Sequence, residues 1–146
     1  MKDFLTIIQS VLEEQNKSTK ILFEDGVISK NTFYKYKQQN PSLKTLIKLA
    51  DYLKVSIDYM YELSDENKYR KYSDNQTDFY NKLITLINSA GISQRKFCKD
   101  LHYAKNNISR YKNGVIPNIQ TLLETAEYFG CTVDDLLTKE DYCRNY

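Results

Sequence analysis

Basic and amide side chains are concentrated in one short stretch, Ser93 to Gly114, which reads SQRKFCKDLHYAKNNISRYKNG. The stretch holds six Lys/Arg and four Asn/Gln, and Asp100 is its one acid, so its local charge is +5. Guanidinium and ammonium groups bind phosphate oxygens, and an Asn amide can form two hydrogen bonds with the edge of adenine. These residue types therefore favour contact with a polyanion that also presents bases.

The net charge of the whole chain gives no such indication. Its 146 residues include 21 Lys+Arg and 19 Asp+Glu, a formal net charge of +2, so only the distribution of charge is informative. Residues 119–146 contain six acids against two bases, and residues 17–37 contain five lysines against two acids. We expect the basic side of each region to face a polyanion and the acidic side to face away from it.

Few residues are suited to catalysis or to metal binding. His102 is the only histidine, and the three cysteines, Cys98, Cys131 and Cys143, lack Cys-x-x-Cys spacing. Cys98 and Cys131 fall at apolar positions, so we interpret them as small core residues. The four glycines form no phosphate-binding loop. We therefore expect no enzyme activity, no cofactor and no metal site.

Hydrophobic runs along the chain are short. None approaches the ~20 residues of a membrane span. The start of the chain lacks the apolar core of a signal peptide. Both observations predict a cytoplasmic location.

The chain contains an internal repeat. At an offset of 75 residues, Phe4 matches Phe79. One further residue near Gly114 changes the offset to 76, and residues 41–61 (PSLKTLIKLADYLKVSIDYMY) then align with residues 117–137 (PNIQTLLETAEYFGCTVDDLL). So ordered a match predicts two copies of one module.

The repeat predicts the domain boundaries. The first module covers residues 1–63 and the second covers residues 79–138. Between them, residues 64–78 are polar and contain no Leu, Ile, Val or Phe, so we expect a linker with no core of its own. Residues 139–146 are a C-terminal tail. Modules this small should be all-helical, with mostly local contacts.

Apolar periodicity predicts five short helices in each module, and capping signals in the second copy mark where they begin and end. The signals are Ser93, Asn113-Gly114, Asn118 and Thr132. We expect the third helix to start near Ala104 and to turn Ile108 and Tyr111 inward. The fourth helix should bury four apolar residues, Ile119, Leu122, Leu123 and Ala126. Among the tyrosines, those at core positions are Tyr36, Tyr52, Tyr111 and Tyr128, whereas Tyr34, Tyr69 and Tyr72 have no assigned place.

The stretch from Ser93 to Gly114, followed by residues 117–137, resembles the helix-turn-helix domain of Cro and the phage repressors, the XRE-like family. That family's pattern begins with a polar cap and a Gln that open helix two, an apolar pair and a turn. It continues with a polar start of helix three, an Ile, a closing Asn-Gly and a Pro/Leu/Ala/Leu/Asp/Leu tail. The matching residues of the second copy are Ser93, Gln94, Phe97, Cys98, Ile108, Asn113, Gly114, Pro117, Leu122, Ala126, Asp134 and Leu136. The first copy matches through Ser18, Leu22, Phe23, Ser29, Phe33, Pro41, Leu46, Ala50, Asp58 and Met60.

The resemblance implies an all-α fold of two tandem five-helix lambda-repressor-like domains. It also implies sequence-specific binding of double-stranded DNA by a repressor-like transcriptional regulator, with helix three of each module in the major groove. The implied DNA-binding residues of the second copy are Gln94, Arg95, Lys105, Asn106, Asn107, Ser109, Arg110 and Asn113. Those of the first copy are Thr19, Lys30, Asn31, Thr32 and Lys35. No small-molecule ligand is implied, and the protein can act as a homodimer or as a pseudo-dimer of its own modules.

The first copy departs further from the family pattern. The turn position that usually holds Gly has His102 in the second copy and Val27 in the first, where Gly26 lies one residue earlier. A β-branched residue is strained at positive φ, so we expect Val27 to avoid that conformation and the first turn to be shifted or longer. Thr19 replaces the usual Gln, and Gln38-Gln39 replaces Asn-Gly. We therefore predict that the second copy is the main DNA reader.

An alternative function is consistent with the same sequence. Helix-turn-helix modules can also serve as a protein-interaction or dimerisation scaffold, as in an antitoxin-like or phage-encoded partner. Selection of bound sequences from random duplex DNA distinguishes the two hypotheses.

Overall fold

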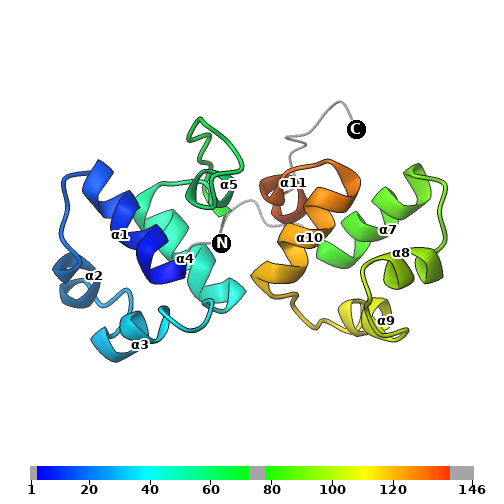
Figure 1. The fold of residues 1–146 in the computed structure, drawn as a ribbon, viewed down its shortest axis with the longest axis horizontal. Helices are drawn as coiled ribbons and strands as arrows, with labels where there is room; N and C mark the ends of the chain where they lie inside the picture. Colours follow the sequence, from blue (N-terminus) through cyan, green and yellow to red (C-terminus); the bar gives the residue numbers. More distant parts are fainter. Residues whose placement is uncertain (1–2, 73–77, 139–146) are drawn as a thin grey trace. The chain divides into compact units, whose positions relative to one another are not determined.

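The computed structural model describes residues 3–72 and 78–138, which belong to two compact units, residues 1–73 and 74–146 (Figure 1). The fold is all-α, as the sequence predicts. The helices of the first unit are α1 (Phe4–Glu14), α2 (Lys20–Glu24), α3 (Lys30–Lys35), α4 (Leu43–Leu53) and α5 (Ile57–Met60). Those of the second unit are α7 (Phe79–Ser89), α8 (Gln94–Asp100), α9 (Asn107–Lys112), α10 (Ile119–Phe129) and α11 (Val133–Leu137).

The capping residues predicted from the sequence determine where several helices begin. The Ser93 Oγ accepts a hydrogen bond from the Lys96 N–H at 3.0 Å, which satisfies an amide that has no partner inside α8. Asn118 caps α10 and Thr132 caps α11 in the same way, at 2.8 and 3.0 Å. At the other end of α9, Gly114 has a φ of +93° and closes the helix after Asn113.

The two units repeat the same aromatic contact in their cores. In the first unit the rings of Phe4 and Tyr36 meet edge to face, with centroids 5.3 Å apart. In the second unit Phe79 and Tyr111 meet edge to face at 5.1 Å. Each pair joins the first helix of its unit to the third, so the geometry at offset 75 agrees with the sequence repeat.

Helix four is buried on a slightly different face from the one predicted. Ile119, Leu122 and Ala126 are buried, as expected. Leu123, however, is only half-buried, and Thr125 is fully buried in its place. The prediction counted only apolar residues, whereas a small β-branched hydroxyl residue also fits a close helix–helix contact.

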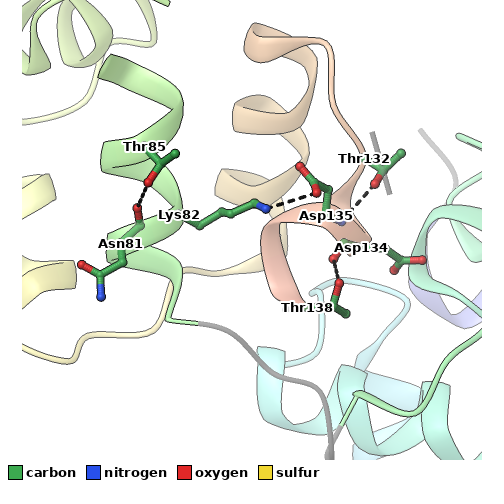
Figure 2. Close-up of polar contacts among 7 residues, drawn as sticks. All are labelled: Asn81, Lys82, Thr85, Thr132, Asp134, Asp135 and Thr138. Atoms are coloured by element: carbon green, nitrogen blue, oxygen red, sulfur yellow. Dashed lines mark hydrogen bonds and ion pairs between the residues drawn. The ribbon is translucent and has the colours of Figure 1, made fainter. Parts of the chain in front are cut away.

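The second unit contains a buried ion pair that has no counterpart at the matching positions of the first (Figure 2). Lys82 Nζ on α7 lies 3.2 Å from Asp135 Oδ1 on α11, and the two side chains are 18% and 0% exposed. The repeat places Ile7 and Tyr59 at the matching positions of the first unit, where the Tyr59 hydroxyl donates to the Glu14 carboxylate at 3.0 Å. The contact between the first and fifth helices thus contains an ion pair in the second unit and a tyrosine–carboxylate hydrogen bond in the first.

The segment predicted to be a linker packs on the first unit over residues 64–72. Tyr72 is 1% exposed, and its hydroxyl oxygen accepts a hydrogen bond from the Ile57 N–H at 2.8 Å. The Tyr69 hydroxyl and the Tyr72 N–H both donate to Asp51 Oδ1 at 2.9 Å. Residues 64–72 therefore pack on the first unit, because tyrosine rings supply the apolar surface that Leu, Ile, Val and Phe do not. That the linker has no core of its own and spans residues 64–78 stays a prediction.

Candidate nucleic-acid interface

In each unit the turn between the second and third helices is closed by one residue in the left-handed conformation. Gly26 (φ +69°) and His102 (φ +60°) take that role, and Val27 does not, as the strain argument predicted. The N–H of the next residue bonds back across the turn, from Val27 to the Leu22 carbonyl at 2.9 Å and from Tyr103 to the Cys98 carbonyl at 2.8 Å. Helix two therefore ends one residue earlier in the first unit, and the left-handed turn residue is shifted by one position.

A second hydrogen bond holds helix two against helix four in both units. The Tyr128 hydroxyl donates to Asp100 Oδ2 at 2.7 Å, and the Tyr52 hydroxyl donates to Asp25 Oδ2. Lys96 Nζ also lies 3.1 Å from Asp100 Oδ2. The hydrogen bond from Tyr128, followed by that from Lys96, lowers the pKa of Asp100 below its ordinary value. The carboxylate thus fixes the C-terminal end of α8 beside α10.

Helix three of the second unit begins later than the sequence predicted. Its first residue is Asn107, and Asn106 is an N-cap residue whose side chain makes no cap hydrogen bond. Lys105 and Asn106 therefore lie in a turn, which the Asn107 N–H closes by donating to the Ala104 carbonyl at 3.1 Å. Ala104 has no side-chain oxygen that could cap a helix at Lys105, which explains the late start.

The first unit has the cap that the second lacks. Ser29, which matches Ala104 at offset 75, accepts a hydrogen bond at its Oγ from the Thr32 N–H at 3.1 Å. As a result α3 begins at Lys30, the residue that matches Lys105. The same Lys-Asn pair thus opens the helix in the first unit and precedes it in the second.

Ten of the thirteen predicted DNA-binding residues are exposed. They are Gln94, Arg95, Lys105, Asn106, Ser109, Arg110 and Asn113 in the second unit, and Lys30, Asn31 and Lys35 in the first. The other three, Asn107, Thr19 and Thr32, are half-buried.

Two of the predicted hydroxyl residues form hydrogen bonds within their own unit. The Ser109 hydroxyl donates to the Asn106 carbonyl at 2.9 Å. Thr32 Oγ1 accepts a hydrogen bond from the Ser29 hydroxyl at 2.8 Å and so belongs to the cap of α3. Thr19 occupies the N-cap position of α2 and makes no side-chain cap hydrogen bond.

A hollow of about 990 Å³ lies between α8 and the start of helix three in the second unit. Its lining brings together three predicted residues, Gln94, Arg95 and Lys105. Lys96 and Lys99 line it as well, and both are exposed lysines that the sequence prediction did not include. Both lysines contribute to the local charge of +5 between Ser93 and Gly114, so that charge could have identified them as part of a basic surface.

The acidic side of the second unit is smaller than its sequence suggests. Asp134 and Asp135 are buried, with exposures of 3% and 0%, so they do not contribute to an acidic surface. Glu124 is half-buried and accepts a hydrogen bond from the Tyr103 hydroxyl at 2.7 Å. Of the acids between residues 119 and 138, only Glu127 is exposed. The expected separation of charge therefore rests mainly on the exposed bases.

Several other predictions concern the part of the chain that the structure describes. Cys98 is buried and Cys131 is half-buried, and burial raises the pKa of the Cys98 thiol; Cys143 lies outside the described residues. Within residues 3–72 and 78–138, no three His, Cys, Asp or Glu side chains are grouped so that they could hold a metal ion. None of the helices in these ranges has both the length and the apolar character of a membrane crossing.

Comparison with known protein families agrees with the geometry of these turns. The family model for the Cro/C1-type helix-turn-helix DNA-binding domain matches the chain twice, at residues 8–66 and 82–141. The chain belongs to this family and contains two tandem DNA-binding domains of the Cro/C1 type, which confirms the resemblance found in the sequence. No curated protein and no solved structure matches the chain significantly.

Proposed function

We propose that this protein is a sequence-specific double-stranded DNA-binding transcriptional regulator of the repressor-like type. Helix three of each unit, α3 or α9, enters the major groove, which is wide enough to admit an α-helix. The observation that carries the proposal is the repeated helix-turn-helix unit. Its third helix and the residues that flank this helix expose basic and amide side chains, while Phe33 or Ile108 is buried against the core.

The second unit supplies most of the charge. All six of its bases between residues 93 and 114 are exposed, and several surround the hollow beside α8. Lys96, Lys99 and Arg95 contact phosphates and place the unit on the duplex, while Asn106 and Arg110 contact base edges. A contact to phosphate contributes affinity at any sequence, whereas a bidentate contact to a base contributes about 1–3 kcal/mol of discrimination.

The first unit takes part as well. Lys30 and Asn31 occupy the first turn of a well-capped α3, where side chains can reach base edges, and Lys35 lies exposed one turn later. Two units in one chain can occupy two half-sites one helical turn, about 34 Å, apart without a second chain.

Single substitutions test these roles. Asn106→Ala should weaken binding to a selected site by about 1–3 kcal/mol and leave binding to a scrambled duplex almost unchanged. Lys96→Ala should weaken binding to both duplexes equally, and Lys68→Ala, which removes an exposed lysine from the packed segment 64–72, serves as the control. Lys68→Ala should bind both duplexes like the unsubstituted protein. If Asn106→Ala does so too, Asn106 does not contact a base.

A further inference from the structure

Tyr34 is the most exposed aromatic side chain among the large hydrophobic residues that the structure describes. It lies on α3 and is 56% exposed. Its ring meets the buried Phe33 ring at an edge, with centroids 5.4 Å apart and planes inclined by 72°. Most of the Tyr34 ring thus faces water, where an aromatic surface gains nothing for the stability of the unit.

Helical spacing places Tyr34 on the face of α3 that the proposed function turns toward DNA. Lys30 precedes Tyr34 by four residues and Asn31 by three, so the three side chains are neighbours on one side of the helix. All three are exposed, whereas Phe33 and Tyr36 are buried on the other side. An apolar ring therefore stands within a face that is otherwise basic and amide.

The second unit has nothing comparable at the matching position. Ser109 matches Tyr34 at offset 75, and its hydroxyl donates to the Asn106 carbonyl inside the unit. The DNA-facing sides proposed for the two units thus share a Lys-Asn pair. They differ three to four residues later, where the first unit exposes the Tyr34 ring and the second has the Ser109 hydroxyl, which already donates a hydrogen bond.

We propose that Tyr34 contacts the C5 methyl group of a thymine in the major groove. The first unit then requires a thymine at a step where the second unit does not, and the target consists of two non-identical half-sites. This inference rests on the proposed function. The chemistry is that of direct readout, in which apolar side chains recognise thymine because no other DNA base carries that methyl group.

Deoxyuridine, which pairs like thymine but lacks the methyl group, isolates this contact. Each thymine of a duplex selected with the whole chain is replaced in turn by deoxyuridine, and the dissociation constant is measured at one stated salt concentration. Burial of one methyl is worth about 0.8 kcal/mol, and 1.4 kcal/mol is a factor of ten, so one replacement should weaken binding about fourfold.

Two variants assign the effect to Tyr34. Tyr34→Ser, which introduces the residue type of the second unit, should bind the thymine duplex about fourfold more weakly and should not distinguish deoxyuridine from thymine at that step. Tyr34→Phe should keep the discrimination, because it keeps the ring. Circular dichroism melts should coincide for all three proteins, since Tyr34 is exposed.

The outcomes separate this inference from the proposed function. Failure of the unsubstituted chain to bind duplex DNA would overturn the proposed function itself. Binding that no deoxyuridine weakens, or a deoxyuridine effect that persists in Tyr34→Ser, would overturn the role of Tyr34 alone. Loss of affinity in Tyr34→Phe equal to that in Tyr34→Ser would show that the hydroxyl, and not the ring, makes the contact.

Discussion

The buried ion pair between Lys82 and Asp135 should contribute strongly to the stability of the second unit. Removing one partner of a buried ion pair takes away the opposite charge beside the other, which typically costs 3–5 kcal/mol. Asp135 is fully buried, but Lys82 retains 18% exposure and can move toward water. We therefore expect Lys82→Ile or Asp135→Val to lower the free energy of unfolding of the second unit by about 3 kcal/mol, the low end of that range.

The first unit suggests the compensating substitution. Ile7 occupies the position that matches Lys82, so Lys82→Ile introduces a residue that the same fold already accommodates. Asp135→Val replaces the fully buried carboxylate by a small apolar residue, because a ring like that of the half-buried Tyr59 would not fit there. Exchange of a buried ion pair for apolar residues of similar volume is often neutral or stabilising. The double variant should therefore lie within about 1 kcal/mol of the unsubstituted protein, although each single variant does not.

Hydrogen exchange read by mass spectrometry is the suitable assay, because two units in one chain need not unfold together and a single melting curve would mix them. Peptides from α7 and α11 should exchange about a hundredfold faster in each single variant, which is what about 3 kcal/mol implies. Peptides from α1 and α4 serve as an internal control and should not change. Single variants that leave α7 and α11 unaffected, or a double variant less protected than both, would refute this account of the pair.

Three further outcomes follow from local geometry. Ser29→Ala should destabilise the first unit by about 1 kcal/mol through loss of the helix cap, whereas Ala104→Ser should extend α9 back to Lys105, as backbone chemical shifts would show. DNA affinity should fall steeply with salt, with a slope of about 0.9 per phosphate contact in a plot of log affinity against log salt concentration. Arg110→Ala should reduce that slope by no more than about 0.9, the value of one phosphate contact. Equal affinity at low and physiological salt would exclude phosphate contacts by these basic residues. Folding lowers the pKa of Asp100 below its ordinary value. The contribution of this carboxylate to stability is therefore fully present above the unfolded pKa and is lost as the pH falls through the lower, folded pKa. Tyr128→Phe removes the hydrogen bond that lowers the pKa most, so it should raise the Asp100 pKa in an NMR titration.

The sequence predicted the fold because its signals are local. Ser93, Asn118 and Thr132 each cap a helix by accepting a hydrogen bond from the amide three residues later, a contact that depends only on nearby residues. The repeat added a second, independent signal, since the Phe4–Tyr36 contact recurs as Phe79–Tyr111.

What the sequence did not predict depends on contacts between distant segments. The Tyr72 hydroxyl accepts a hydrogen bond from the N–H of Ile57, the first residue of α5, which lies 15 residues earlier in the chain. No local sequence pattern distinguishes such a buried tyrosine from one in a solvated linker. From the sequence alone Asp135 would be assigned to the surface, and only the packing of α7, which places Lys82 beside it, explains its burial. The late start of α9 was predictable in principle, because Ala104 stands where the other copy has Ser29, but the periodicity of the apolar residues concealed it.

Selection from random duplex DNA tests the central claim, sequence-specific binding by two tandem units, most directly. The whole chain is incubated with a random library at a stated salt concentration, and the enriched duplex is then titrated against a scrambled one. We predict a single enriched site with two half-sites about one helical turn apart, bound at least about 10³-fold more tightly than the scrambled duplex. Enrichment of no sequence, with equal affinity for both duplexes, would contradict the claim that this protein reads DNA.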